Sequence, residues 1–182
     1  ISSLRGLDAI LVPGGFGKRG TEGKIAAIKH ARENKIPYLG ICLGMQLAVI
    51  DVIRSAGCMS AGSSEFGVCE PAVVDILPND SQDMGATMRL GNRAALVSEN
   101  SLVHKIYNQM EIQERHRHRY EINTKYLEEF EKNGMIFSAE SDDSKRMEIL
   151  EIPSHKFYFG VQFHPEFNSR PGFPEESFEA FI

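Results

Sequence analysis

The segment 40–44, Gly-Ile-Cys-Leu-Gly, constrains the fold of this chain more than any other feature. The apolar run Ile36–Ile41 is typical of a strand buried on both faces. Apolar residues then recur at helical spacing, and Gly57 stands where a helix would end; they are Met45, Val49, Val52, Ile53 and Ala56. Because strand and helix almost touch in sequence, the chain must turn sharply, and glycines on both sides of Cys42 permit that turn.

Cys42 at this turn is a candidate nucleophile, in the position that a nucleophile elbow gives to its reactive residue. We expect its sulfur to lie exposed at the bend, where the positive end of the helix favours the thiolate and lowers the pKa of the thiol. The alternative is a small buried core residue, but packing alone does not explain two flanking glycines. Cys58 and Cys69 lack this context, and we interpret them as structural thiols.

The pattern of elements predicts an α/β fold. Asp8–Val12 and Ile36–Ile41 read as buried strands, and Glu22–Asn34 between them reads as a helix. A strand, helix, strand order favours a mostly parallel central sheet with flanking helices and functional loops after the strands. Residues 57–70 read as a loop, whereas 88–97, 147–152 and 157–163 read as further strands, the first two in a mixed or antiparallel region.

His164 and Glu166 follow the aromatic strand at 157–163. We expect Pro165 to keep this segment extended, which directs both side chains to the same side. A histidine that takes the proton of a thiol, oriented by a carboxylate, completes a set of nucleophile, base and orienter with Cys42. The alternative is a structural histidine, which the location after a strand of the same sheet makes less attractive.

A glycine-rich loop, Pro13–Gly17, follows the first strand. Such a loop brings backbone N–H groups close to a ligand, and together with the N–H of Leu43 it would stabilise an oxyanion. A phosphate-binding loop is the alternative. It is disfavoured because the Gly-Lys-Ser/Thr ending and a complete G-x-G-x-x-G are both missing.

The basic run Arg115–Arg119 alternates arginine and histidine, as in an extended segment with two different faces. Two histidines without a third placed ligand are poor evidence for a metal site, and we expect none. Nucleic-acid binding is disfavoured because the chain is acidic and no aromatic residues interleave the run. One of its guanidinium groups would instead suit a substrate carboxylate.

Composition fits one globular domain over residues 1–182, with 20 basic and 25 acidic residues, a net charge of −5 and 42% hydrophobic residues. We expect neither nucleic acid nor a membrane as partner, since the chain is acidic and has no apolar run long enough to span a bilayer. Three cysteines without a zinc pattern favour a reducing compartment, and we expect the cytoplasm. Because the sequence starts at Ile1, we also expect upstream structure.

Longer motifs run across nearly the whole chain: Pro13–Lys24, Leu39–Gln46, Ser64–Phe66, Met88–Gly91, Glu114–Glu121 and Gly160–Phe167. With its cysteine elbow and distant His-x-Glu, the chain resembles the class I glutamine amidotransferases. More narrowly, segments 16–20 and 115–120 resemble the glutaminase domains of the CTP synthase family.

The resemblance implies that Cys42 attacks the side-chain amide of L-glutamine to form a γ-glutamyl thioester. It implies that His164 passes the proton to departing ammonia and that Glu166 holds the imidazole. It further implies a set of residues that bind glutamine or its oxyanion: Gly15, Leu43, Gly44, Met45, Gln46, Glu65, Arg119 and Tyr120.

The family also implies partners that this chain does not contain. We expect a synthase domain of the same polypeptide that uses ATP and Mg²⁺ to aminate UTP to CTP, GTP as an activator, and a homo-oligomer, a tetramer at full length. The first strand of the family fold and segments after Pro78 and Pro171 are expected to be missing. Two alternatives stay open: another class I amidotransferase or γ-glutamyl peptidase, and a catalytically silent regulatory module.

Overall fold

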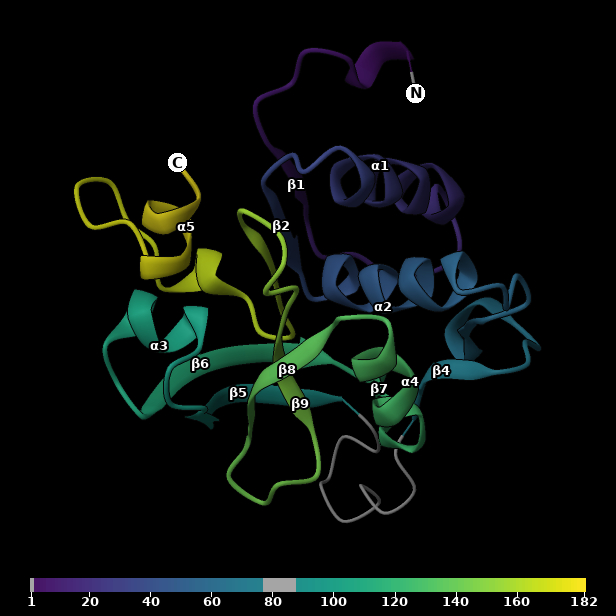
Figure 1. Cartoon of the computed structure of the whole chain (residues 1–182). Helices are drawn as coiled ribbons and strands as arrows, with labels where there is room; N and C mark the ends of the chain where they lie inside the picture. Colours follow the sequence, from purple (N-terminus) through teal and green to yellow (C-terminus); the bar gives the residue numbers. More distant parts are fainter. Residues whose placement is uncertain (1, 77–87) are drawn as a thin grey trace.

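The computed structural model describes residues 2–76 and 88–182, arranged as Figure 1 shows. The helices are α1 (Thr21–Glu33), α2 (Leu43–Ser55), α3 (Leu102–Tyr107), α4 (Leu127–Lys132) and α5 (Glu176–Phe181), with short 3-10 helices η1 (Ser2–Leu4), η2 (Ser64–Phe66), η3 (Thr124–Tyr126) and η4 (Pro165–Phe167). The strands are β1 (Ile10–Val12), β2 (Tyr38–Ile41), β3 (Gly62–Ser63), β4 (Ala72–Asp75), β5 (Arg89–Val97), β6 (Glu111–His118), β7 (Glu121–Ile122), β8 (Ile136–Ser141), β9 (Met147–Glu151) and β10 (Tyr158–Val161).

The central sheet has the order β1-β2-β10-β9-β8-β5-β6. Within this sheet, as far as the residues are described, only β1, β2 and β10 pair in parallel, and the other neighbours are antiparallel. The prediction of a mostly parallel sheet is therefore wrong in this respect. Parallel strands need a crossover such as α1, whereas β8 and β9 are joined directly by the turn at residues 142–146, which permits only antiparallel pairing.

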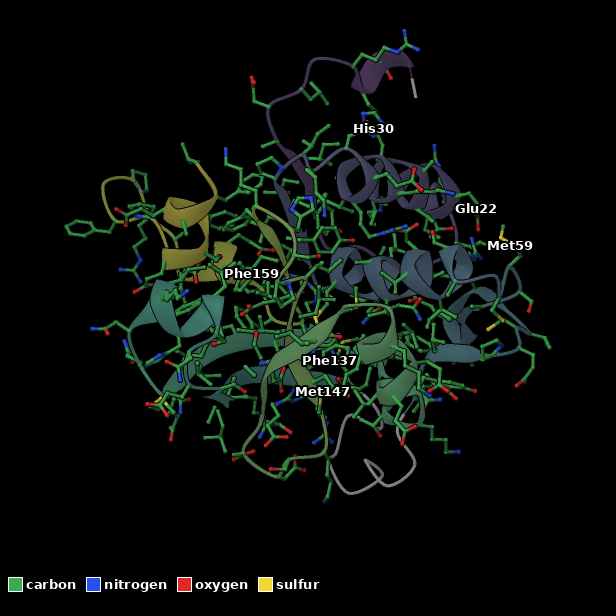
Figure 2. The ribbon with its side chains drawn as sticks, in the orientation of Figure 1. Glu22, His30, Met59, Phe137, Met147 and Phe159 are labelled. Atoms are coloured by element: carbon green, nitrogen blue, oxygen red, sulfur yellow. The ribbon has the colours of Figure 1, made fainter. Side chains whose placement is uncertain are left out.

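Two hydrophobic clusters cover the opposite faces of this sheet. Side chains alternate between the faces along a strand, so Tyr38 joins the cluster under α1 and α2, whereas Leu39 joins the cluster under α3 and α5. Tyr158 and Phe159 of β10 divide in the same way. Figure 1 shows the two pairs of helices on different sides of the strands, and Figure 2 shows Phe159 inside the molecule. Strand β2 and strand β10 are thus buried on both faces, as their sequence predicts, whereas the same prediction is wrong for the edge strand β1, in which Leu11 is exposed.

The early predicted elements correspond to β1, α1, β2 and α2 within about two residues, which is the ordinary uncertainty of element ends. The predicted loop at 57–70 is less simple, because it contains β3 and η2. Strand β3 pairs with β4, and β4 pairs with β7, in a separate three-stranded sheet. The expected gap after Pro78 lies outside the described residues. After Pro171 the chain forms a turn bridged by Arg170 and Phe173 and enters α5.

No helix within residues 2–76 and 88–182 is both long and apolar enough to cross a membrane. Cys42, Cys58 and Cys69 are free thiols.

Candidate active site

The turn at Cys42 joins β2 directly to α2. Cys42 has φ 49° and ψ −101°, a conformation that residues other than glycine rarely adopt. A β carbon at Gly44 would lie 2.2 Å from the carbonyl oxygen of Val12, and one at Gly40 would lie 2.8 Å from the carbonyl carbon of Gly44. The start of α2 therefore packs backbone against backbone on the end of β1. This close approach is the physical reason for both glycines, and the predicted sharp turn is confirmed.

Cys42 is buried at this turn. Only 2% of the residue is exposed, and it belongs to the cluster under α3 and α5. Burial raises the pKa of the thiol to about 12, although a hydrogen bond from the backbone N–H of Leu43 acts in the other direction. The predictions of an exposed sulfur and a lowered pKa are wrong, because desolvation outweighs the helix N-terminus. The resting thiol is therefore neutral at pH 7.

Gly14 lies next to both His164 and Cys42. A β carbon at Gly14 would lie 2.8 Å from Cε1 of His164 and 3.5 Å from Cβ of Cys42. Glycine at this position thus leaves open the space between Cys42 and the imidazole of His164. The sequence placed the glycine-rich loop near the reacting groups but did not single out Gly14, whose role becomes visible only when three distant segments meet.

The imidazole of His164 is held from its Nδ1 side. Nδ1 lies 2.7 Å from Oε1 of Glu166, whose side chain is 44% exposed, and the ring stacks on Phe167 with centroids 5.1 Å apart. The segment is not extended as predicted: Pro165 begins η4, and this tight turn brings Glu166 back to the ring. The backbone N–H of His164 donates to the carbonyl oxygen of Arg115, which ties the ring to β6.

Nε2 of His164 is buried and has no hydrogen-bond partner among residues 2–76 and 88–182. Because the carboxylate of Glu166 accepts a hydrogen bond from the N–H at Nδ1, the neutral ring has its lone pair at Nε2. A ring nitrogen without a partner, on an imidazole that approaches Cys42 next to Gly14, is a candidate general base for the thiol.

Of the other predicted residues, Gly15 and Glu65 border the elbow or its glycine-rich loop, and Met45 does not. A β carbon at Gly15 would lie 3.3 Å from Cδ2 of Leu43, so the glycine-rich loop borders the elbow. The backbone N–H of Gly17 donates to Oε1 of Glu65 at 2.6 Å, so Glu65 ties η2 to that loop. Met45 is fully buried in the cluster under α1 and α2 and presents no side chain to a ligand.

Gln46 and Tyr120 are in contact. Nε2 of Gln46 donates to the carbonyl oxygen of Tyr120 at 2.8 Å, and Gln46 is only 3% exposed. Tyr120 is half-buried against the cluster under α1 and α2, whereas Arg119 is exposed. The structure therefore brings Gln46 and Tyr120 together one turn beyond the elbow and leaves the Arg119 side chain toward solvent.

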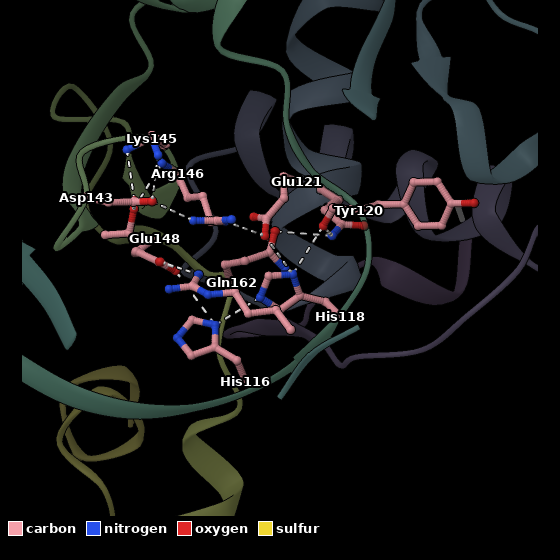
Figure 3. Close-up of polar contacts among 12 residues, drawn as sticks. His116, His118, Tyr120, Glu121, Asp143, Lys145, Arg146, Glu148 and Gln162 are labelled. Atoms are coloured by element: carbon pink, nitrogen blue, oxygen red, sulfur yellow. Dashed lines mark hydrogen bonds and ion pairs between the residues drawn. The ribbon is translucent and has the colours of Figure 1, made fainter. Parts of the chain in front are cut away.

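Strand β6 alternates buried and exposed residues, as predicted for the basic run. Its two histidines, His116 and His118, point inward into a polar group that Figure 3 shows with Glu148 and Gln162. Sequence reasoning gave these histidines no function. The signal was the strict alternation itself, since it places polar rings on the inward face. No three His, Cys, Asp or Glu side chains within the described ranges are grouped so as to hold a metal ion.

Comparisons with known proteins agree with this geometry. The family model described as glutamine amidotransferase class-I matches residues 1–182. A CTP synthase of Methanococcoides burtonii is 57% identical over 186 residues, which cover 100% of this chain and 34% of that protein. A CTP synthase of Staphylococcus haemolyticus is 51% identical over 183 residues, and this match covers 98% of the present chain and 34% of the Staphylococcus protein. The chain thus spans about a third of the length of these relatives.

A solved structure, the glutaminase domain of Trypanosoma brucei CTPS with bound acivicin, superposes with a TM-score of 0.93. It is 46% identical, and the match covers 99% of this chain and 71% of that one. The predicted α/β class with flanking helices is confirmed by this superposition.

Proposed function

Because the chain belongs to the class I glutamine amidotransferase family, we propose that it is the glutamine-hydrolysing domain of a CTP synthase. The relatives that match its whole length support this choice of acceptor. One observation carries the chemistry: Cys42 and His164 flank the open space left by Gly14, with Glu166 on the far nitrogen of the ring. The catalytic residues of the proposal are Cys42, His164 and Glu166.

The reaction starts from a neutral thiol. His164 takes the proton of Cys42 at Nε2 as the sulfur attacks the carboxamide carbon of L-glutamine, and Glu166 stabilises the imidazolium. The N–H groups of Gly15 and Leu43 stabilise the oxyanion. His164 then protonates the leaving nitrogen, the C–N bond breaks, and ammonia and a γ-glutamyl thioester remain. Water attacks the thioester, which yields glutamate and returns the proton to sulfur.

The amino-acid end of glutamine is held by groups of matching charge. Glu65 suits the α-ammonium and Arg119 suits the α-carboxylate. Both N–H groups of the Gln46 amide are committed within the protein, to Tyr120 and to Gln162, so its carbonyl oxygen is the atom left for substrate. Gly44, Met45 and Tyr120 contribute backbone and shape to this end of the site.

Ammonia is consumed elsewhere in the polypeptide. The proposed acceptor is a synthase domain that uses ATP and Mg²⁺ to convert UTP to CTP, with GTP as activator and a cytoplasmic tetramer as the working form. The length of the relatives supports a further domain, since this chain spans only about a third of them.

The test is release of glutamate from L-glutamine by the full-length protein that carries this chain. Cys42→Ala is expected to lower turnover by at least about a thousandfold, because it removes the nucleophile. The matched control is Cys58→Ala, which changes a half-buried thiol outside the elbow and should leave turnover intact. Substantial turnover by Cys42→Ala would overturn the mechanism.

Two further measurements decide between the alternatives. If the wild-type protein releases no glutamate, the alternative of a catalytically silent regulatory module is supported. Glutamate release without UTP-dependent capture of ammonia would indicate a different amidotransferase or a γ-glutamyl peptidase. A diazo-ketone analogue of glutamine should label one thiol per chain, and a peptide map with the adduct on Cys69 would contradict the assignment of Cys42.

A further inference from the structure

The amide of Gln46 has its orientation fixed by the protein. Its Nε2 faces the carbonyl oxygen of Tyr120 at 2.8 Å and Oε1 of Gln162 at 3.1 Å. A backbone carbonyl only accepts hydrogen bonds, so the nitrogen of Gln46 must point to Tyr120. Gln162, which is fully buried and two residues before His164, is then oriented in turn, because its oxygen must face that nitrogen.

The carbonyl oxygen of Tyr120 has a second neighbour, His118. Nδ1 of His118 lies 3.3 Å from this oxygen and 3.4 Å from Oε1 of Glu121. Oε1 of Glu121 also faces Nε of Arg146 at 3.4 Å, so it acts as an acceptor. Two acceptors at one nitrogen require that Nδ1 of His118 carries the hydrogen.

The tautomer of His118 determines that of His116. Burial lowers the pKa of both imidazoles far enough that they are neutral at pH 7. Nε2 of His118 therefore has a lone pair, and Nδ1 of His116, 2.9 Å away, must donate to it. The hydrogen bonds between the rings run in one direction, from His116 through His118 to Tyr120, as can be followed in Figure 3.

The chain of hydrogen bonds is anchored to strands β5 and β9. Oε2 of Glu148 lies 3.8 Å from Nδ1 of His116, and its Oε1 pairs with Arg89 at 2.5 Å. The carbonyl oxygen of Glu148 also accepts from the backbone N–H of Gln162 at 2.8 Å. Glu148 of β9 thus faces His116, where the series of hydrogen bonds begins, and holds the backbone of Gln162, where it ends.

We propose that His116, His118 and Gln162 are positioning residues that fix Tyr120 and the amide of Gln46 for glutamine. The proposal rests on the function proposed above. None of the three needs to touch substrate: they act through the carbonyl oxygen of Tyr120 and the oriented amide. Their loss should weaken glutamine binding, seen as a higher KM, while the chemical step at Cys42 is largely retained.

Two variants of His118 separate the effect of its hydrogen bond to Tyr120 from the effect of a changed side-chain volume. In His118→Asn the amide nitrogen replaces Nδ1 and still donates to Tyr120, whereas in His118→Gln it replaces Nε2 and loses that donation. We expect His118→Gln, which loses the donation to Tyr120, to raise the KM for glutamine about tenfold with kcat within about threefold. His118→Asn keeps that donation and loses only the hydrogen bond from His116, so we expect it to raise the KM by less than His118→Gln, again with kcat within about threefold. Equal KM values in the two variants, or a fall in kcat at unchanged KM, would overturn the proposal.

Histidine tautomers provide a second readout that needs no variant to fold. In the protein labelled with ¹⁵N-histidine, long-range ¹H–¹⁵N spectra should show hydrogen on Nδ1 of both His116 and His118, unchanged from pH 6 to pH 8. Hydrogen on Nε2 of His118 would overturn the proposal even if the kinetics agreed. If the wild-type protein releases no glutamate, the proposed function fails, whereas the spectra still decide whether this chain of hydrogen bonds exists.

Discussion

His164 and His118 are both buried, yet their surroundings differ at every ring nitrogen. His118 has both nitrogens engaged, with His116 on one side and Tyr120 and Glu121 on the other. His164 has one nitrogen on a half-exposed carboxylate and the other free of partners in the part of the chain that the structure describes. The first ring is therefore fixed in one tautomer, and the second keeps a lone pair for a proton.

The difference indicates how one fold uses the same residue for support and for chemistry. Most buried polar atoms of a folded protein are paired, and both nitrogens of His118 follow this rule. A ring that moves a proton must tolerate a charge, and the exposed side of Glu166 gives that charge access to water. Of these two rings, the one with a partnerless nitrogen is therefore the candidate for chemistry, and the one with both nitrogens paired is the candidate for support.

The largest effect is expected on the supporting side. Arg89→Met leaves Glu148 buried without its guanidinium, and breaking a buried pair in this way costs about 3–5 kcal/mol of unfolding free energy. Urea unfolding of the variant measures this loss. The double variant Arg89→Met, Glu148→Leu removes both charges and should recover part of the stability. A loss below about 1 kcal/mol would mean that the Arg89–Glu148 pair contributes no more than an exposed surface ion pair, which would contradict its supporting role.

The reacting side should respond in the opposite way. Glu166→Gln removes the charge that holds the imidazolium, and glutamate release should fall about a hundredfold or more. The unfolding free energy should change by less than about 1 kcal/mol, because the carboxylate is half exposed and its pairing is screened. Unchanged turnover together with a marked loss of stability would reverse the roles assigned to the two regions.

A smaller effect is expected at the link between the regions. Glu114 lies on the inward face of β6, and its Oε2 accepts from Nδ2 of Asn168, the residue that follows η4. Burial, with Glu175 and Glu176 adding to it, raises the pKa of Glu114 to about 8, whereas an unfolded glutamate titrates near 4.5.

The folded state therefore keeps a proton that the unfolded state has lost between these two values. The stabilisation is fully present below about pH 4.5 and is lost as the pH rises toward 8. Glu114→Gln should flatten the decline in unfolding free energy from pH 5 to pH 8, measured by urea unfolding at several pH values. An equal decline in wild type and variant would show that Glu114 does not titrate in this range.

The sequence predicted the parallel half of the sheet better than the antiparallel half. Continuous apolar runs identify β2 and β10 because both of their faces are buried. Strand β8 has the sequence Ile-Phe-Ser-Ala-Glu-Ser, with buried serines, so neither alternation nor apolar content distinguishes it from a loop. Helix α3 has only six residues, too few for a periodic pattern.

The candidate site divides in a similar way. The elbow at Cys42 and the spacing of His164 and Glu166 are local patterns, so the sequence contains them. The burial of Cys42 is not local: it depends on the cluster under α3 and α5, whose residues come from distant segments of the chain. The hydrogen bonds of Gln46 likewise join residues more than seventy positions apart, which no pattern within one segment indicates.

The turn at residues 142–146 sets the register of β9, which pairs with β10 in antiparallel orientation. Because these strands run in opposite directions, the beginning of β9 lies beside the end of β10, and Glu148 thereby meets Gln162. Successive residues of a strand face opposite sides, so lengthening this surface turn by one residue and sliding the register would replace the Glu148 carboxylate with an aliphatic neighbour. The length of the hairpin turn between β8 and β9 thus determines which residue of β9 lies next to His116 and Gln162.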